Sequence, residues 1–155
     1  TARGVKGITL EEEDGLVAMD IVSPQNQGAS ILSVTENGYG KKTRIDEYPL
    51  QGRGGKGVIT IKTSARNGKM VGVQQITEQD DVMLITDKGK IIRLRGSEIS
   101  VIGRNTQGVK LIELEPAEKV MALARLAEKD EEANGQAGEE DQEAGAIENG
   151  ESGKP

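Results

Sequence analysis

Residues 82–94 have the sequence VMLITDKGKIIRL, which predicts a β-hairpin. A run of aliphatic and β-branched residues leads into Asp87-Lys88-Gly89, and a second aliphatic run follows from Ile91 to Leu94. Glycine at the turn supplies the positive φ that tight hairpin connections need. Short apolar runs bounded by turn residues are typical of strands and not of helices.

The same pattern occurs about fifty residues earlier, which indicates an internal repeat. Thr35–Tyr39 matches Thr86–Lys90 at an offset of 51, and Lys69–Val73 matches Lys119–Leu123 at an offset of 50. An Arg-Gly motif, in which a β-branched residue follows the last glycine, occurs at residues 3–8, 53–58 and 104–109, with arginines 50 and 51 residues apart. Three separate features at one period make coincidence an inadequate explanation.

Each repeat unit contains about four short runs that predict strands. The runs that lead into the two turns are Ile31–Thr35 and Val82–Thr86, and the further runs are Val58–Lys62, Met70–Val73 and Ile91–Leu94. Four short strands per unit of about 40 to 50 residues is typical of a propeller-like blade. We therefore expect an all-β body at residues 1–127, with about two and a half blades of about four antiparallel strands.

The segment after Pro116 is the one place where a helix competes with a strand. Residues 117–129 are rich in Ala, Leu, Glu and Lys, which favour helix. The repeat partner of this segment has a strand pattern, so we expect a strand at Val120–Leu126. From residue 128 onward only Ile147 is aliphatic, which predicts that residues 128–155 form a disordered acidic tail.

The composition excludes many kinds of chemistry. There is no Cys, His, Trp or Phe, which excludes disulfides, Cys/His zinc sites and catalysis by cysteine or histidine. No carboxylate pair forms an acid/base couple, so we expect a non-catalytic module without a cofactor or metal of its own. No apolar run approaches the ~18 residues of a membrane span, so we expect a cytoplasmic protein without a membrane partner. The chain starts within a repeat and without Met, which indicates a fragment of a longer protein.

The charge is divided between two segments of opposite sign. Residues 128–155 hold ten acids against two lysines, a net charge of −8, so residues 1–127 carry +2 of the total of −6. Between Lys41 and Lys110 there are fourteen basic residues against seven acidic ones, a net charge of +7. This asymmetry indicates an anionic partner for the body.

The glycine-rich stretch Gly52–Gly57 fits the G-x-G-x-x-G dinucleotide pattern formally. That pattern must open a helix, whereas here the glycines lead into Val58–Lys62. The Walker pattern also fails, because Gly57 follows Lys56. We expect instead that the glycines let the backbone approach phosphate while Arg53 and Lys56 point outward. The alternative is a glycine-rich linker between blades. Residues 11–14 lack the ligand spacing of a calcium loop, so we expect a solvated turn there.

The kind of nucleic acid is indicated by the aromatic residues. Single-strand binders stack bases on aromatic side chains, and this chain has only Tyr39 and Tyr48. Duplex DNA is therefore favoured, bound through phosphate contacts with weak sequence preference. Strand alternation predicts that Arg93 and Arg95 share a face, as do Lys42 and Arg44. The predicted phosphate-contacting residues are Arg3, Lys6, Lys41, Lys42, Arg44, Arg53, Lys56, Arg93, Arg95 and Arg104.

Three motifs resemble the last blades of the C-terminal domain of the bacterial DNA gyrase A protein. They are QGRGGKG at 51–57, ENGYGKKTR at 36–44 and SEISVIGRNTQGV at 97–109. The resemblance covers residues 1 to about 127. It implies a six-bladed β-pinwheel with exchanged strands, whose basic rim wraps duplex DNA. Gly52 stands where the family's hallmark box has its first arginine, so this copy resembles a later, degenerate one.

The resemblance also implies what surrounds this module. In the family, gyrase A and gyrase B form a heterotetramer that introduces negative supercoils using ATP and Mg²⁺ bound elsewhere, in the cytoplasm at the nucleoid. The family's catalytic tyrosine lies in another domain, and neither Tyr39 nor Tyr48 matches it. An acidic tail is thought to compete for the rim. Two alternatives remain open: the corresponding C-terminal domain of topoisomerase IV, and a propeller-type protein-interaction module.

Overall fold

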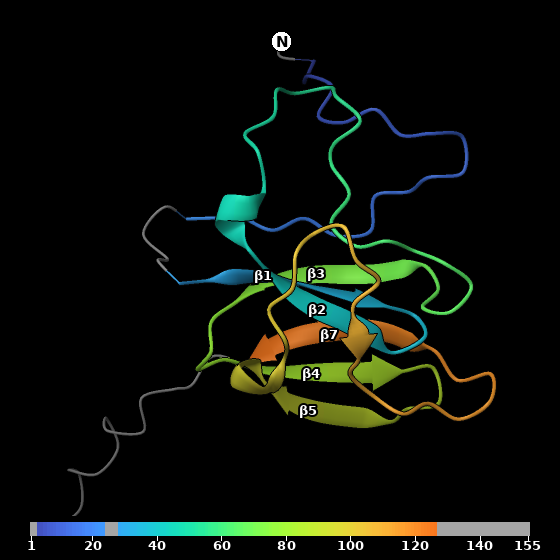
Figure 1. Cartoon of the computed structure of the whole chain (residues 1–155). Helices are drawn as coiled ribbons and strands as arrows, with labels where there is room; N and C mark the ends of the chain where they lie inside the picture. Colours follow the sequence, from blue (N-terminus) through green and yellow to red (C-terminus); the bar gives the residue numbers. More distant parts are fainter. Residues whose placement is uncertain (1–2, 24–27, 127–155) are drawn as a thin grey trace, which may run out of the picture.

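The computed structural model describes residues 3–23 and 28–126, which form an all-β structure built on two sheets (Figure 1). Strands in the first sheet follow the order β3-β1-β2-β6, and those in the second the order β5-β4-β7, with every neighbouring pair antiparallel. The bounds are β1 (Ser30–Thr35), β2 (Tyr39–Arg44), β3 (Met70–Ile76), β4 (Asp81–Thr86), β5 (Ile91–Arg95), β6 (Val109–Lys110) and β7 (Val120–Leu126). Two 3-10 turns follow the hairpins: η1 (Ile45–Glu47) and η2 (Gly96–Glu98).

The two sheets share one construction, which confirms the predicted fold class and both hairpins. The turn glycines Gly38 and Gly89 both have φ of +79°, the left-handed conformation that glycine adopts without strain. The first strand of each hairpin also pairs with an outer strand, β3 or β7, with a register shift at the equivalent place. The structure forms β7 where helix and strand competed, because pairing with β4 outweighs the local helix propensity.

A strand is exchanged between the two sheets. Residues 99–112 follow the second hairpin in sequence but pack along β2 of the first sheet. The amide of Lys42 donates to Ser100 O at 3.0 Å, and that of Ile102 donates to Lys42 O at 2.8 Å. Farther along, β6 pairs with Tyr39 and Gly40. This segment makes β2 an inner strand.

The strand predicted at Val58–Lys62 does not form, and the repeat explains why. At the offset of 51, Val58 and Ile59 correspond to β6, which pairs with the hairpin of the preceding unit. Among the described residues no hairpin stands one period before Val58, so the run joins no sheet there, and Ile59 is 58% exposed. Residues 3–23 likewise form no strand.

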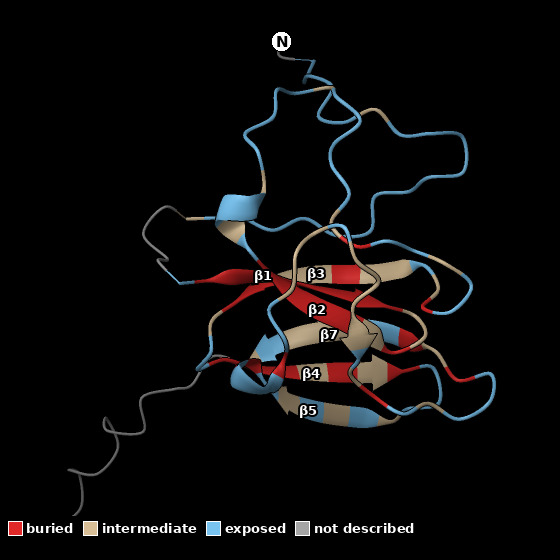
Figure 2. Cartoon of the chain, in the orientation of Figure 1, coloured by how far each residue is buried: buried red, intermediate tan, exposed pale blue. Residues whose placement is uncertain are grey.

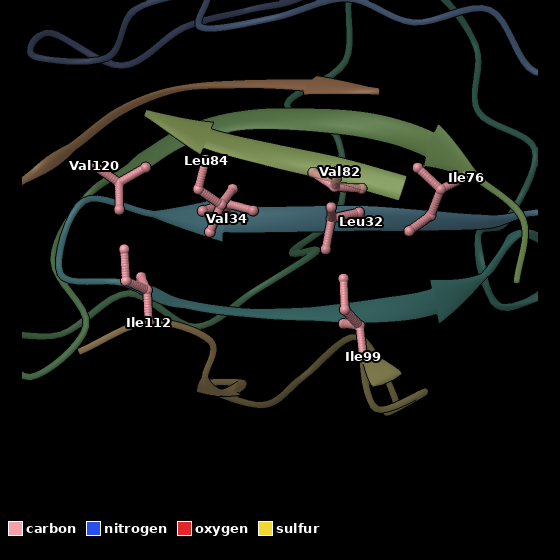
Figure 3. Close-up of a cluster of buried hydrophobic side chains, with 8 residues drawn as sticks. All are labelled: Leu32, Val34, Ile76, Val82, Leu84, Ile99, Ile112 and Val120. Atoms are coloured by element: carbon pink, nitrogen blue, oxygen red, sulfur yellow. The ribbon is translucent and has the colours of Figure 1, made fainter. Parts of the chain in front are cut away.

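The hydrophobic core lies between the two sheets and beneath the exchanged segment. Leu32, Val34 and Ile76 come from the first sheet, and Val82, Leu84 and Val120 from the second. Ile99 and Ile112 of the exchanged segment complete the cluster (Figure 3). Burial is concentrated in the strands, whereas residues 3–22 and 49–59 are mostly exposed (Figure 2).

Candidate nucleic-acid interface

The Arg-Gly loops at residues 3–8, 53–58 and 104–109 lie next to one another, and we call them the loop row. The amide of Gly54 donates to Gly7 O at 2.8 Å, and the amide of Thr9 donates to Gly55 O at 2.8 Å. The amide of Lys62, just beyond the second loop, donates to Thr106 O of the third at 2.8 Å. Segments that are far apart in the sequence thus lie side by side (Figure 1).

The glycines fix the shape of these loops. Gly4 and Gly54, at equivalent places in the first two loops, have φ of +74° and +77°, and Gly57 and Gly108 have +79° and +75°. At Gly108 a Cβ would also lie 2.7 Å from Gly40 O. A larger residue there would push the third loop away from β2.

The first two loops expose four of the predicted phosphate-contacting side chains, and Arg53 and Lys56 point outward as predicted. Arg3, Lys6 and Arg53 are exposed and pair with no carboxylate in the described segments. Lys56 is 73% exposed and its ammonium lies 3.0 Å from the carboxylate of Glu11, which is 70% exposed. An exposed pair of this kind is worth little in free energy, so a phosphate can displace it. Glu11 belongs to the predicted solvated turn, which the structure forms with Asp14 N donating to Glu11 O at 3.1 Å.

The guanidinium of Arg104 binds the protein itself. Its Nε donates to Glu47 O at 2.7 Å and its Nη1 to Ile59 O at 3.0 Å, and it lies 5.8 Å from the centre of the Tyr48 ring. A guanidinium has five N–H donors, so three remain for an outside ligand. Arg104 therefore joins the third loop to the preceding repeat unit, a role that the sequence pattern did not indicate.

Lys41 was predicted to contact phosphate, and the structure contradicts this because the side chain is completely buried. Its ammonium donates to Gly103 O at 2.5 Å, Arg104 O at 2.6 Å and Thr106 Oγ1 at 3.0 Å. Burial lowers the pKa of Lys41, nearby Glu47 acts in the opposite direction, and Arg104 lowers the pKa further. The residue holds the third loop from beneath.

Lys42 is likewise corrected from phosphate contact to a structural role. It is 2% exposed, donates to Gly96 O at 2.6 Å and lies 3.5 Å from the Glu78 carboxylate. Both lysines are covered by segments distant in sequence. Residues 103–106 of the exchanged segment bind Lys41, and Gly96 and Glu78 bind Lys42. Single-sequence periodicity cannot reveal a cover that comes from the next unit.

The predicted cations on β5 lie apart from the loop row. Arg93 and Arg95 share the exposed face of β5, as predicted, but β5 is the far edge strand of the second sheet (Figure 1). Arg93 forms an ion pair with Asp81, and its Nε donates to that carboxylate at 2.5 Å. The ten predicted residues therefore do not form one continuous track in the described part of the chain.

Arg44 is 66% exposed, whereas Lys42 on the same face of β2 is covered. The guanidinium of Arg44 is 2.5 Å from the Asp46 carboxylate. This hydrogen-bonded pair lowers the pKa of Asp46 and raises that of Arg44. Arg44 is therefore less available to a phosphate than the unpaired cations of the loop row.

Sequence reasoning missed a second group of free cations, at residues 62–69, which we call the basic turn. Its sequence is KTSARNGK, three basic residues in eight with no acid between them, and this density is the signal that could have found it. Lys62, Arg66 and Lys69 are exposed and pair with no carboxylate among the described residues. The guanidinium of Arg66 lies 4.9 Å from the centre of the Tyr39 ring.

Two other features of the described segments bear on function. No helix in residues 3–23 and 28–126 is long and apolar enough to cross a membrane. Over the same residues, no cluster of carboxylates has the arrangement of a metal site.

Comparison with known proteins places these features in a family. The profile of the "DNA gyrase C-terminal domain, beta-propeller" family matches residues 1–23, 29–77 and 80–127. The gyrase A protein of Salmonella typhimurium is 52% identical over 128 residues, which cover 83% of this chain and 14% of that protein. This chain therefore spans only a small part of the length of the relatives it matches.

Two solved structures share the fold. A DNA gyrase A C-terminal domain superposes with a TM-score of 0.69 at 24% identity, covering 79% of this chain and 41% of that one. The C-terminal domain of DNA topoisomerase IV gives 0.72 at 23% identity, covering 79% and 38%.

Proposed function

Because the chain belongs to the family of DNA gyrase C-terminal β-propeller domains, we propose that it binds and bends duplex DNA along the loop row as part of a gyrase A protein. The observation that carries the proposal is the pairing of the first two Arg-Gly loops. Gly54 N donates to Gly7 O, which brings the exposed cations of both loops onto one edge. Phosphate backbones are gripped by this combination of exposed amides, Arg and Lys.

The energetics of such binding are electrostatic. Bending 20 to 30 base pairs by 40 to 90° costs on the order of 1 to 6 kcal/mol. Each phosphate contact releases counterions and contributes about −0.9 to the slope of log K against log salt. The four cations Arg3, Lys6, Arg53 and Lys56 alone would give a slope of about −3.6. Binding should therefore hold a bend at low salt and lose it at high salt.

The proposal extends to the protein in which the module works. Relatives of this chain are gyrase A proteins, which supports a place beside gyrase B in a heterotetramer of the bacterial cytoplasm and nucleoid. There the module would assist ATP-dependent negative supercoiling without catalysing a step itself. The predicted acidic tail falls outside the described residues. We propose that it competes with DNA for the loop row.

Gel-shift titrations of the 155-residue chain with linear duplex DNA at several salt concentrations test the proposal. The triple variant R3A/K6A/R53A should flatten the salt slope by about three relative to the unmodified chain. An unchanged slope would reject the loop row as the binding surface. A chain that binds an acidic protein but shows no salt-dependent duplex binding would instead be a protein-interaction module.

A topoisomer-shift assay on the full-length gyrase A protein tests bending and the role of the tail. Proteins with and without residues 128–155 are compared on relaxed plasmid. Removal of the tail should increase the shift in linking number, because a competitor for the loop row is lost. A smaller shift on removal would contradict the proposed competition.

A further inference from the structure

We propose that the duplex path continues from the loop row across the third loop onto the basic turn, and does not run toward Arg93 and Arg95 on β5. This inference rests on the proposed function, because it specifies which surface the duplex follows. It adds Lys62, Arg66 and Lys69 to the binding surface. It also excludes a pair of arginines that the repeat pattern favours equally.

The basic turn adjoins the third loop. Asn67 is completely buried and its Nδ2 donates both to Lys62 O at 2.7 Å, within the turn, and to Gln107 O at 3.1 Å, in the third loop. The amide of Lys62 donates to Thr106 O at 2.8 Å. The backbone of the basic turn is therefore fixed directly against the loop row.

The turn is also held in shape, so its cations are presented without a large ordering cost. The Oδ1 of Asn67 accepts from the amide of Ser64 at 2.8 Å, and Asn37 Nδ2 donates to Arg66 O at 3.0 Å. The ring of Tyr39 supports the guanidinium of Arg66, a cation–π contact that leaves the N–H edge of the guanidinium free.

The neighbouring carboxylate does not neutralise these cations. Glu36 lies beneath the turn, where its Oε1 accepts from the amide of Lys69 at 3.1 Å. Its ion-pair partner is Lys119, at 3.7 Å. The side chains of Lys62, Arg66 and Lys69 are thus exposed and form no ion pair with Glu36.

The β5 surface lacks these properties. Asp81 already pairs with Arg93, so a phosphate there would have to displace a carboxylate. Only Arg95 remains without an ion pair on that strand among the described residues. In addition, β5 lies at the edge of the second sheet that is farthest from the first two loops (Figure 1).

Matched double variants test the path by salt slope. R66A/K69A should flatten the slope of log K against log salt by about two, and R93A/R95A should leave the slope unchanged. The charge-conserving variant R66K/K69R should retain the original slope, which separates loss of charge from loss of fold. The proposed path is wrong if R93A/R95A flattens the slope, or if R66A/K69A does not while R3A/K6A/R53A does. In that last case the loop row stands as the binding surface without the basic turn.

Site-directed cleavage gives a second readout, because the chain contains no cysteine. A DNA-cleaving iron chelate is attached through A65C in the basic turn or through I91C on the exposed face of β5. Bound duplex should be cut from A65C and not from I91C. Cutting from I91C alone would overturn the path, and cutting from neither, while the chain still binds duplex, would place DNA on the first two loops only.

Discussion

The two faces of the first sheet differ in chemistry although the repeat gives the sheets equivalent residues. Between the sheets, Leu84 and Ile99 both belong to the apolar core. On the opposite face of the first sheet, the position equivalent to Leu84 is Ser33, whose Oγ lies 3.2 Å from the Oγ1 of Thr60. Thr60 in turn bonds the hydroxyl of Tyr48, the residue equivalent to Ile99. One interface is therefore held by apolar packing and its counterpart by hydrogen bonds.

The two repeat units therefore share their strand pairing more fully than they share the side chains that pack between layers. Pairing is carried by the backbone and needs only the correct turn and register. Which side chains pack against a face of the sheet depends on the segment that covers that face. The apolar face is covered by a complete sheet, and the polar face by residues 48–61, which form no strand.

The largest expected effect is at Leu84, where L84A should lower the free energy of unfolding by about 3 kcal/mol, because a fully buried side chain leaves a cavity between the sheets. The matched variant S33A removes one hydrogen bond that Thr60 can replace, so it should cost less than about 1 kcal/mol. Urea unfolding followed by circular dichroism measures both. Equal losses would mean that the two faces contribute alike, contrary to the comparison.

A smaller effect is expected at Lys41, whose equivalent in the second sheet is Ile92. K41I removes the ammonium that binds Gly103 O, Arg104 O and Thr106 Oγ1. Leaving these partly buried acceptors unpaired should cost about 2 kcal/mol of unfolding free energy, with faster amide exchange in the third loop. K110I, at a half-exposed lysine on β6, is the control and should leave exchange in that loop unchanged. If K41I stabilises the chain, packing outweighs the hydrogen bonds.

The smallest effect concerns the turns that precede the outer strands. Asn67 closes the turn before β3, whereas the buried Glu118 closes the turn before β7. Glu118 accepts from the amide of Glu115 at 2.8 Å, the hydroxyl of Thr86 at 2.7 Å and the ammonium of Lys90 at 2.9 Å. These bonds, with the backbone one the strongest, lower the pKa of Glu118 to about 2.

A carboxylate whose pKa is lowered by folding stabilises the protein above its unfolded pKa, near 4.5, and this stabilisation is lost as pH falls toward 2. E118Q should therefore reduce the urea midpoint at pH 6, and its difference from the unmodified chain should shrink between pH 4.5 and 2. E113Q, at an exposed glutamate, should show no such dependence. A difference that stays constant with pH would show that shape and not charge matters at this turn.

The sequence predicted the features that depend on local pattern. The hairpins and their glycine turns follow from residues that are near one another in the chain. The period related one hairpin to the other, and it also predicted the strand at Val120–Leu126 against the local helix propensity. What could not be predicted depends on distant pairing. Lys41 and Lys42 carry the same charge as Arg53, but contacts with residues distant in sequence bury both lysines while Arg53 is exposed.

The candidate site shows the same limit. Glycine and cation spacing located the loop row, because the motif recurs in each unit. The basic turn occurs once, so the period could not indicate it, and its position against the third loop depends on the contact between Asn67 and Gln107. The partners of Arg104, at Glu47 and Ile59, are also set by how successive units stack.

Exchange of residues 99–112 means that the unit of sequence and the unit of folding have different boundaries. A fragment cut at one full period would contain a hairpin without the segment that covers its inner strand. It would also contain a covering segment whose own hairpin had been removed. Transplanting or deleting a single unit therefore requires cuts shifted by roughly a strand from the obvious motif. Backbone hydrogen bonds also connect the two sheets. A force that slides one sheet past the other would therefore have to break these bonds as well as the apolar contacts.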